Sequence, residues 1–398
     1  MENTQPKYLL VVNAGSSSIK FAIYQTDTAL THLTADATGQ IEGIGNQPSL
    51  TIKSVEGLVL VDHRLSVDEV PDHASAIALI HTWLLNYLAG GTLLAVGHRV
   101  VHGGQHYSAP VLINATVLAE LETLIPLAPL HQPHNLTIIH LLLESMPSIP
   151  QVACFDTAFH HTQPDVAQRF AIPRSFTDEG VRSYGFHGLS YEYITSVLPK
   201  LEPKLSHARI IIAHLGNGAS LCAIHNGQSI ATTMGFSPLD GLVMGTRCGN
   251  IDPGVLLYLM DHHKMNAHAV EQLLYYQSGL LGVSGVSNDM RTLLASDDPH
   301  AQEAIELFIY RINREIGSLI AALGGIDALV FTGGIGEHSA EIRTKVCHQA
   351  AWLGIELDDS ANQAAAMHIS TPNSKRSVWV LPTDENLMIA HHTLKLFL

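Results

Sequence analysis

Short apolar runs alternate along most of the chain with longer segments whose apolar positions recur at helical spacing. The runs that predict buried strands occupy residues 9–12, 94–96, 210–213 and 328–332. The segments that predict helices occupy residues 74–88, 117–125, 136–144, 267–277 and 301–322. Because strands that alternate with helices form sheets covered by helices, the pattern predicts an α/β architecture.

Two stretches far apart in the chain repeat one pattern. Residues 9–27 read LLVVNAGSSSIKFAIYQTD and residues 210–228 read IIIAHLGNGASLCAIHNGQ. Each has an apolar run, a polar residue (Asn13 or His214), a glycine turn rich in small residues and a second apolar run. Such a turn can offer N–H groups and hydroxyls to a polyphosphate, although a polar hairpin loop has the same composition. The repetition indicates two related halves with a boundary near residues 155–165.

A third glycine cluster, FTGGIGEH at residues 331–338, directly follows a predicted strand. It is not a dinucleotide-binding GxGxxG, because Ser339 stands at the third glycine position, and no Walker A sequence occurs in the chain. A tight turn would explain one such cluster. Three clusters at strand ends favour phosphate-binding loops.

Composition and charge exclude several classes of function. The chain has 398 residues, 46% hydrophobic and 14% charged, which gives room for two or three domains. Its net charge of -15 argues against a nucleic-acid or anionic-membrane partner. It shows no secretory signal, no long uninterrupted apolar segment and no CxxC pair among its four cysteines. We therefore expect a cytoplasmic protein.

The 25 histidines suggest a metal site, but their spacing gives it little support. There is no HExxH sequence. His98 and His102 are four residues apart, yet adjacent valines in GHRVVH favour a strand over a helix. On a strand Arg99 and Val101 share one face, and a cation beside an apolar side chain suits a small apolar anion.

Five ionisable residues stand in segments marked by glycine or proline: Arg99, Asp156, His187, Arg247 and Glu385. Each alone could be a surface ion pair or a helix cap. Together they suit phosphoryl transfer, which depends on positioning and on positive charge around the moving group. Two carboxylates are enough for Mg²⁺, which keeps several of its waters. An acceptor that is itself a carboxylate would need the arginines to offset its charge but would need no general base.

The chain resembles the acetate and propionate kinase family, which belongs to the superfamily of actin, sugar kinases and heat-shock ATPases. The motifs that carry the resemblance follow the family's order: VVNAGSSSIKF, GHRVVHGG, LAPLHQPHN, FDTAFH, YGFHGLSYEY, HLGNGAS, GFSPLDGLVMGTRCGNIDPG, SGVSNDMR, FTGGIGEHS and PTDENLMIA. The resemblance implies two domains, residues 1–157 and 158–387, with duplicated ribonuclease-H-like cores and an active site in the interdomain cleft. It also implies a C-terminal helix, residues 388–398, that packs back on the first domain, and a homodimer.

The resemblance assigns roles to residues that match the family's motifs. The catalytic residues implied are Asn13, Arg99, His131, Asp156, His187 and Arg247. The metal would be served by Asn13, Asp156 and Glu385. The acyl group would be bound by Arg99, Val101, Leu130, Phe186 and Pro238. The nucleotide would be bound by Ser16, Ser18, Lys20, His214, Gly216, Asn217, Gly218, Asp289, Met290, Arg291, Gly333, Gly334, Ile335 and Gly336.

The activity implied is the reversible, Mg²⁺-dependent transfer of the γ-phosphoryl group of ATP to acetate, giving acetyl phosphate and ADP by in-line displacement, with Mn²⁺ as a substitute metal. One alternative is a kinase for propionate or another short-chain fatty acid. A more remote one is an ATP-gated binding module.

The chain departs from the family at four places. Asp384-Glu385-Asn386 stands where Asn-Glu-Glu is common, which keeps the central glutamate. Gln105, Asn250 and His338 replace the common glutamate, aspartate and asparagine. None of these changes removes an expected catalytic group.

Overall fold

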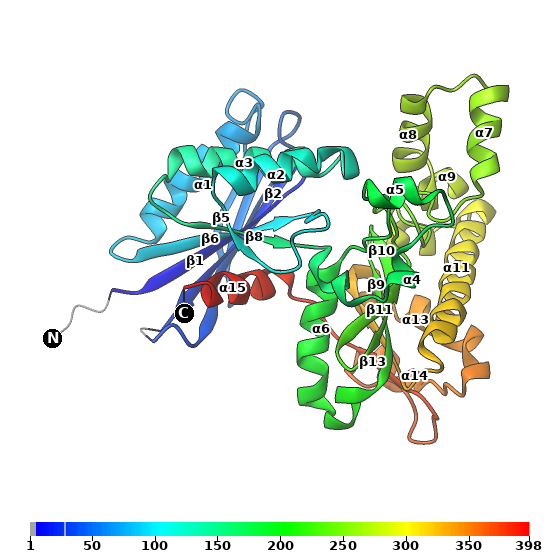
Figure 1. The fold of residues 1–398 in the computed structure, drawn as a ribbon. Coiled ribbons are helices and arrows are strands. Elements are labelled where there is room, and N and C mark those ends of the chain that lie inside the picture. The colour runs from blue at the N-terminus through cyan, green and yellow to red at the C-terminus, as the bar shows by residue number, and fades with distance from the viewer. Residues whose placement is uncertain (1–4, 28, 398) are drawn as a thin grey trace. The chain divides into compact units, whose positions relative to one another are not determined.

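The computed structural model describes residues 5–27 and 29–397 and divides into two compact units (Figure 1). Unit 1 is Met1–Ala158 together with Asp384–Leu398, and unit 2 is Phe159–Thr383. Each unit has one mixed sheet with helices packed against it, which confirms the α/β class.

The sheet of unit 1 has eight strands in the order β5-β4-β3-β2-β1-β6-β8-β7. Their bounds are β1 Lys7–Ala14, β2 Ser18–Thr26, β3 Leu33–Glu42, β4 Ser49–Ser54, β5 Val59–Arg64, β6 Thr92–Val100, β7 Val111–Leu112 and β8 Gln151–Phe155. Strands β1 to β5 form antiparallel pairs, whereas β6 runs parallel to both β1 and β8. The side chains of β1 and β6 therefore alternate in register across the centre of the sheet.

Helices contact the sheet of unit 1 on both faces. They are α1 His73–Tyr87, α2 Ala115–Thr123, α3 Gln132–Ser145 and α15 Glu385–Lys395. One face packs Leu10, Val12 and Val96 against apolar residues of α1 and α3. Helix α15, drawn in red in Figure 1, runs along β1 and β6, where Gly97 gives it room. A Cβ atom at Gly97 would lie 2.3 Å from Thr393 Oγ1, so the close approach of this helix requires glycine.

The sheet of unit 2 has five strands in the order β11-β10-β9-β12-β13. Their bounds are β9 Arg209–Leu215, β10 Ala219–His225, β11 Gln228–Thr232, β12 Ala328–Thr332 and β13 Ser377–Val380. The main helices are α6 Gly188–Leu201, α7 Pro253–His262, α8 Ala267–Tyr276, α11 Pro299–Leu323 and α13 Ala340–Gln349. Shorter ones are α4 Asp165–Gln168, α5 Arg174–Asp178, α9 Gly279–Ser284, α10 Met290–Leu294, α12 Gly333–His338 and α14 Asp359–Gln363. Helices α6 and α11 lie on opposite sides of this sheet (Figure 1).

The two sheets share one topology. The segment β3-β2-β1-β6-β8 corresponds strand for strand to β11-β10-β9-β12-β13, with an antiparallel first part and a parallel second part in both. The repeat seen in the sequence is thus a structural duplication, as expected for two ribonuclease-H-like cores.

The predicted strands lie within β1, β6, β9 and β12, and the predicted helices overlap α1, α2, α3, α8 and α11. One detail of the strand prediction was wrong. Strand β6 ends at Val100, so strict alternation of faces does not extend to Val101, whose N–H donates to Asn135 Oδ1 at 3.0 Å. Among the described residues, we find no helix with both the length and the apolar composition needed to cross a bilayer.

Candidate active site

Three polar side chains lie in a row across the sheet of unit 1. Asn13 near the end of β1 pairs directly with Lys20 of β2, and the parallel register of β1 and β6 places Arg99 on its other side. All three share one face because residues in register point to the same side of a sheet. Arg99 Nη1 donates to Asn13 Oδ1 at 3.4 Å. The sheet itself thus fixes the spacing of an amide and two cations.

The Arg99 guanidinium is held by two hydrogen bonds to one carboxylate. Its Nε donates to Asp156 Oδ1 at 3.0 Å and its Nη2 to Asp156 Oδ2 at 2.5 Å. Asp156, which is 1% exposed, follows β8, and its N–H donates to the Val100 carbonyl. Burial opposes the charge on Arg99, but the carboxylates of Asp156 and Glu385 outweigh it, so the pKa of Arg99 is raised. The arginine is therefore an oriented, permanent cation.

Glu385 begins helix α15 and reaches the same neighbourhood. Burial raises the pKa of its carboxyl, while the positive charges of Arg99 and Lys20 oppose that rise. Asp384 caps the helix by accepting the Leu387 N–H at 2.8 Å. A chain segment from the far end of the sequence thus adds a second carboxylate to this group.

We use the name carboxylate–arginine group for Asn13, Lys20, Arg99, Asp156 and Glu385. It offers carboxylate and amide oxygens, the donors that Mg²⁺ prefers. Both oxygens of Asp156 already accept from Arg99, which suits it to orienting charge more than to direct coordination. Among the described residues there is no cluster of three His, Cys, Asp or Glu side chains that could enclose a metal. The group fits a Mg²⁺ that keeps most of its water and phosphate ligands, since this ion needs few protein oxygens.

Three other expected residues of unit 1 lie at or near the amino end of α3. His131 is the residue before this helix, Leu130 precedes it, and buried Val101 contacts the helix through its N–H bond to Asn135. Asn135 also donates to the Ala14 carbonyl at 3.0 Å, so it joins β1 and the end of β6. No role for Asn135 could be predicted from the sequence.

The turn between β1 and β2 holds the two expected serines. Gly15 N–H donates to the Ser18 carbonyl at 2.8 Å and closes the turn, which leaves Ser16 exposed and Ser18 partly buried. The His73 ring contacts the Gly15 carbonyl at 2.9 Å.

Unit 2 brings together two histidines and an arginine. The rings of His187 and His214 stack with centroids 4.3 Å apart. A Cβ atom at Gly218 would lie 2.8 Å from Arg247 Nη2 and 3.3 Å from His187 Nε2, so both side chains converge on this glycine. Arg247 Nη1 donates to the Pro238 carbonyl at 2.5 Å. A guanidinium nitrogen and an imidazole nitrogen thus lie beside the turn of the second hairpin.

Buried serines contact both stacked histidines. Ser220 Oγ lies 2.8 Å from His187 Nδ1 and Ser190 Oγ lies 2.8 Å from His214 Nδ1. The Tyr191 hydroxyl bonds to Ser220 Oγ. These three residues stand inside the quoted motifs YGFHGLSYEY and HLGNGAS but received no role from the sequence, because only the fold shows which atom each one contacts. Two of the residues expected at the acyl group are buried near these side chains. Phe186, which is 1% exposed, directly precedes His187, and the carbonyl of buried Pro238 accepts from Arg247.

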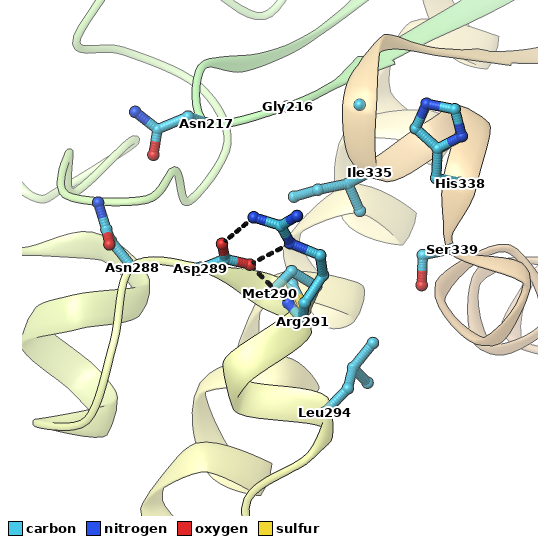
Figure 2. A pocket seen from close by; sticks show the side chains of 11 residues that line it. Gly216, Asn217, Asn288, Asp289, Met290, Arg291, Leu294, Ile335, His338 and Ser339 are labelled. Atoms are coloured by element: carbon cyan, nitrogen blue, oxygen red, sulfur yellow. Dashed lines mark hydrogen bonds and ion pairs between the residues drawn. The ribbon is translucent and has the colours of Figure 1, made fainter. Parts of the chain in front are cut away.

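A cavity of about 640 Å³ lies beside the second hairpin turn (Figure 2). Asp289 pairs with Arg291 at its edge, with Oδ2 and Nη2 2.5 Å apart, and these hydrogen bonds lower the pKa of Asp289 to about 2. Ile335 and His338 come from α12 (Figure 2). The lining residues are Gly216, Asn217, Asn288, Asp289, Met290, Arg291, Leu294, Gly334, Ile335, His338 and Ser339.

Seven of these lining residues are among those expected at the nucleotide, whereas Asn288, Leu294, His338 and Ser339 were not. Asn288, His338 and Ser339 lie within quoted motifs, which was the available signal, whereas Leu294 lies three residues beyond one. Gly333 and Gly336 do not line the cavity. The Gly333 N–H instead donates to Glu337 Oε1 at 2.8 Å, and the Gly336 carbonyl accepts from buried Arg343 at 2.9 Å. These two glycines shape α12 itself.

The sequence matches the model of the acetokinase family over residues 8–391. It is 56% identical over 393 residues to an acetate kinase of Rhodopseudomonas palustris, which covers 98% of both chains. It is 51% identical over 393 residues to an acetate kinase of Methylocella silvestris, which covers 98% of this chain and 97% of the relative.

Solved structures agree with the sequence comparison. A propionate kinase from Francisella tularensis aligns with a TM-score of 0.90 at 38% identity, over 97% of this chain and 98% of the other. The acetate kinase of Porphyromonas gingivalis aligns with a TM-score of 0.87 at 38% identity, over 98% and 100%.

Proposed function

The chain belongs to the acetokinase family, and from that premise we propose that it transfers the γ-phosphoryl group of ATP to acetate, reversibly, giving acetyl phosphate and ADP. The enzyme is a phosphotransferase with a carboxyl group as acceptor. The observation that carries the proposal is the Arg99 guanidinium, held by Asp156 and hydrogen-bonded to Asn13, with Lys20 beside Asn13 on the same sheet and the Glu385 carboxylate close enough to affect its pKa.

The acceptor chemistry explains the cations. Acetate has a pKa of about 4 to 5 and is ionised at neutral pH, so its oxygen attacks phosphorus without a general base. Bringing this charge to a γ-phosphoryl group at about 4 Å costs roughly 4 kcal/mol at an effective dielectric constant of about 20. Arg99 in unit 1 and Arg247 in unit 2 are the groups that we assign to offset it.

We assign the remaining roles from the contacts of the side chains and from the family resemblance. Asp156 holds Arg99 in one orientation, and Asn13 accepts from the same guanidinium. We assign His187 and the turn at Gly218 to the transferring phosphoryl group and the cavity beside α10 and α12 to adenosine. His131 and the apolar residues Val101, Leu130, Phe186 and Pro238 are assigned to the acyl group and its surroundings.

We further propose Mg²⁺ as the cofactor, with Glu385 and Asn13 as its nearest protein oxygens and Asp156 as the group that orders the charge around them. When bound, the ion neutralises charge on the phosphate oxygens. Mn²⁺ also prefers oxygen ligands and is expected to substitute for it.

A direct assay tests the function. The protein is incubated with ATP, Mg²⁺ and acetate, and acyl phosphate is trapped with hydroxylamine. Hydroxamate and ADP are expected in equal amounts. A panel of propionate, butyrate and formate tests the alternative acceptor that the propionate kinase neighbour suggests. Hydroxamate from none of these acids would contradict the proposed function.

We also propose a homodimer in the cytoplasm. Helix α7 has no buried residue, although its sequence is mostly apolar, and Leu257 and Tyr258 are more than half exposed. A helix of this composition is stabilised when a second copy covers it. Leu257→Asp is expected to give monomers in light scattering. A monomeric native protein would contradict the proposal.

A further inference from the structure

Three buried serines of unit 2 each contact the Nδ1 atom of a different histidine, and one of these serines is also hydrogen-bonded to a tyrosine. Ser229 contacts His160 at 2.9 Å, Ser190 contacts His214 at 2.8 Å and Ser220 contacts His187 at 2.8 Å. All three serines are 0% exposed. Because a serine hydroxyl can donate or accept, the other partners of the serine and of the ring decide which ring nitrogen carries the proton.

His160 shows how such a contact operates. Its Nε2 lies 2.9 Å from the Phe186 carbonyl oxygen, which can only accept, so Nε2 carries a proton. Burial lowers the pKa of His160 to about 4, despite the bond to Phe186, so the ring is neutral at pH 7 and Nδ1 has no proton. The Ser229 hydroxyl must therefore donate to Nδ1.

At His187 the direction of the hydrogen bonds follows from the donors available. The Tyr191 hydroxyl bonds to Ser220 Oγ, and Tyr191 is 0% exposed. A phenol is a stronger donor and a weaker acceptor than an aliphatic alcohol, so Tyr191 donates to Ser220. The single proton of Ser220 then goes to His187 Nδ1, which leaves the ring proton on Nε2.

Two features of the surroundings favour a neutral ring held in one place. Arg247 Nη2 and His187 Nε2 both lie close to the Cβ position of Gly218, so the positive charge of a doubly protonated ring would lie near a guanidinium. His187 has a left-handed backbone with φ of 59° and precedes α6, which carries Tyr191 one turn later. The backbone and the two hydroxyls thus fix both the place and the tautomer of the ring.

We propose that Tyr191 and Ser220 are positioning residues that hold neutral His187 as its Nε2–H tautomer, so that Nε2 and Arg247 donate together to the transferring phosphoryl group. That the Nε2–H group donates to a phosphoryl group rests on the proposed function. The assignment of the tautomer does not depend on that function.

The tautomer can be read directly by long-range ¹H–¹⁵N NMR of the full-length protein labelled with ¹⁵N-histidine. His187→Asn assigns the His187 signals by their loss, and His160 supplies an internal reference for a ring protonated at Nε2. We expect His187 at pH 8 to match that reference. In Ser220→Ala we expect a mixture of tautomers, whereas Ser190→Ala is expected to alter His214 and to leave the His187 tautomer unchanged. A native His187 protonated at Nδ1 would overturn the proposal.

Kinetics give the second readout. Ser220→Ala is expected to lower kcat about 10- to 100-fold, with KM for ATP and acetate changed less than about twofold, because the ring still occupies its place but neither its orientation nor its Nε2 proton is fixed any longer. Tyr191→Phe, which keeps the ring packed, is expected to lower kcat by a smaller factor and tests the relay if Ser220→Ala fails to fold. An unchanged tautomer with unchanged kcat in both variants would also overturn the proposal. If acetate is not the acceptor, the NMR result still stands on its own.

Discussion

At the scale of single residues, Arg247 illustrates why an arginine cannot be replaced by another cation. One nitrogen of its fork donates to the Pro238 carbonyl while the other is directed at Gly218. Lysine keeps the charge but cannot occupy both positions. Arg247→Lys is expected to lower kcat about 100-fold or more, with an unchanged melting temperature. Steady-state kinetics and thermal unfolding check this, and wild-type turnover in the variant would remove Arg247 from the site.

Val101 gives a prediction about acceptor length. The residue is 2% exposed and its N–H is fixed by Asn135 at the amino end of α3. Trimming the side chain opens space for roughly one methylene, which is worth about 1 to 3 kcal/mol of discrimination in an apolar pocket. We expect the native enzyme to prefer acetate over propionate and Val101→Ala to narrow or reverse that preference, mainly through KM. The measurement is kcat/KM for acetate, propionate and butyrate; an unchanged ratio would place Val101 away from the acyl group.

Glu385 and its neighbour Asn386 provide a matched pair of variants that tests the metal site. The Glu385 carboxyl is affected by the charges of Arg99 and Lys20, whereas Asn386 lines a groove together with Lys20 and Lys53. Glu385→Ala is expected to reduce activity more than about 100-fold, and Asn386→Ala to shift the Mg²⁺ concentration that gives half-maximal rate. Titrations with Mg²⁺ distinguish them. Equal and mild effects in both variants would argue against a metal role for Glu385.

The sequence identified residues that carry chemistry better than residues that position them. Arg99 and Asp156 could be singled out because they are ionisable residues in segments marked by glycine or proline, and the structure adds their two hydrogen bonds. Ser220, Tyr191 and Asn135 are ordinary core residues by type. Their importance lies in which atom they contact across 33, 29 and 34 residues of chain, and spacing alone cannot show that.

At the scale of elements, the packing of α15 on β6 depends on one missing side chain. A Cβ atom at Gly97 would lie 2.3 Å from Thr393 Oγ1 and 2.7 Å from Ile389 Cγ2. Gly97→Ala is therefore expected to lower the free energy of unfolding of unit 1 by about 1 to 3 kcal/mol, as overpacked cores do. Urea unfolding measures it.

Gly317 supplies the control for Gly97. It lies inside α11, and a Cβ atom there would meet nothing within 4 Å. Gly317→Ala should raise the free energy of unfolding by up to about 1 kcal/mol, because alanine favours a helix over glycine. A stable Gly97→Ala protein would show that α15 can move away from the sheet without cost.

Periodicity located the elements but not their partners. Helix α11 and strands β9 and β12 could be predicted because their apolar positions repeat over enough residues. The extension of unit 1 by β4, β5 and β7 escaped prediction, since β5 is largely exposed and β7 has two residues. The pairing of α15 with β1 and β6 came only from the resemblance.

At the scale of the whole molecule, one buried histidine in each unit makes the stability of that unit depend on pH. Burial lowers the pKa of His98 in unit 1 and of His160 in unit 2 to about 4, although each also has a hydrogen bond that opposes this. The unfolded chain binds their protons near pH 6.5 and the folded chain only near pH 4, so stability is present above pH 6.5 and falls as pH drops between these values.

Each of the two histidines contributes about 3 kcal/mol to that loss at pH 4, by the conversion of about 1.4 kcal/mol per pKa unit. Urea unfolding at pH 7, 5.5 and 4.5 is expected to show the decline in both units. His98→Gln should reduce the pH dependence of unit 1, whereas a change at exposed His300 should leave it as in the native protein. A stability that stays level from pH 7 to 4.5 would contradict the prediction.

The order in which the chain is made has a consequence for unit 1. The chain that begins this unit leaves it at Ala158 and returns only at Asp384, after all of unit 2 has been synthesised. During synthesis the face of the sheet around Gly97 therefore stays uncovered until α15 has been made, whereas Phe159–Thr383 can fold before then. Unit 1 begins before unit 2 but is completed after it, and Glu385 can reach Arg99 only after Phe159–Thr383 has been synthesised. If Glu385 serves the metal as we propose, a chain that ends before Asp384 is expected to be inactive with ATP and acetate.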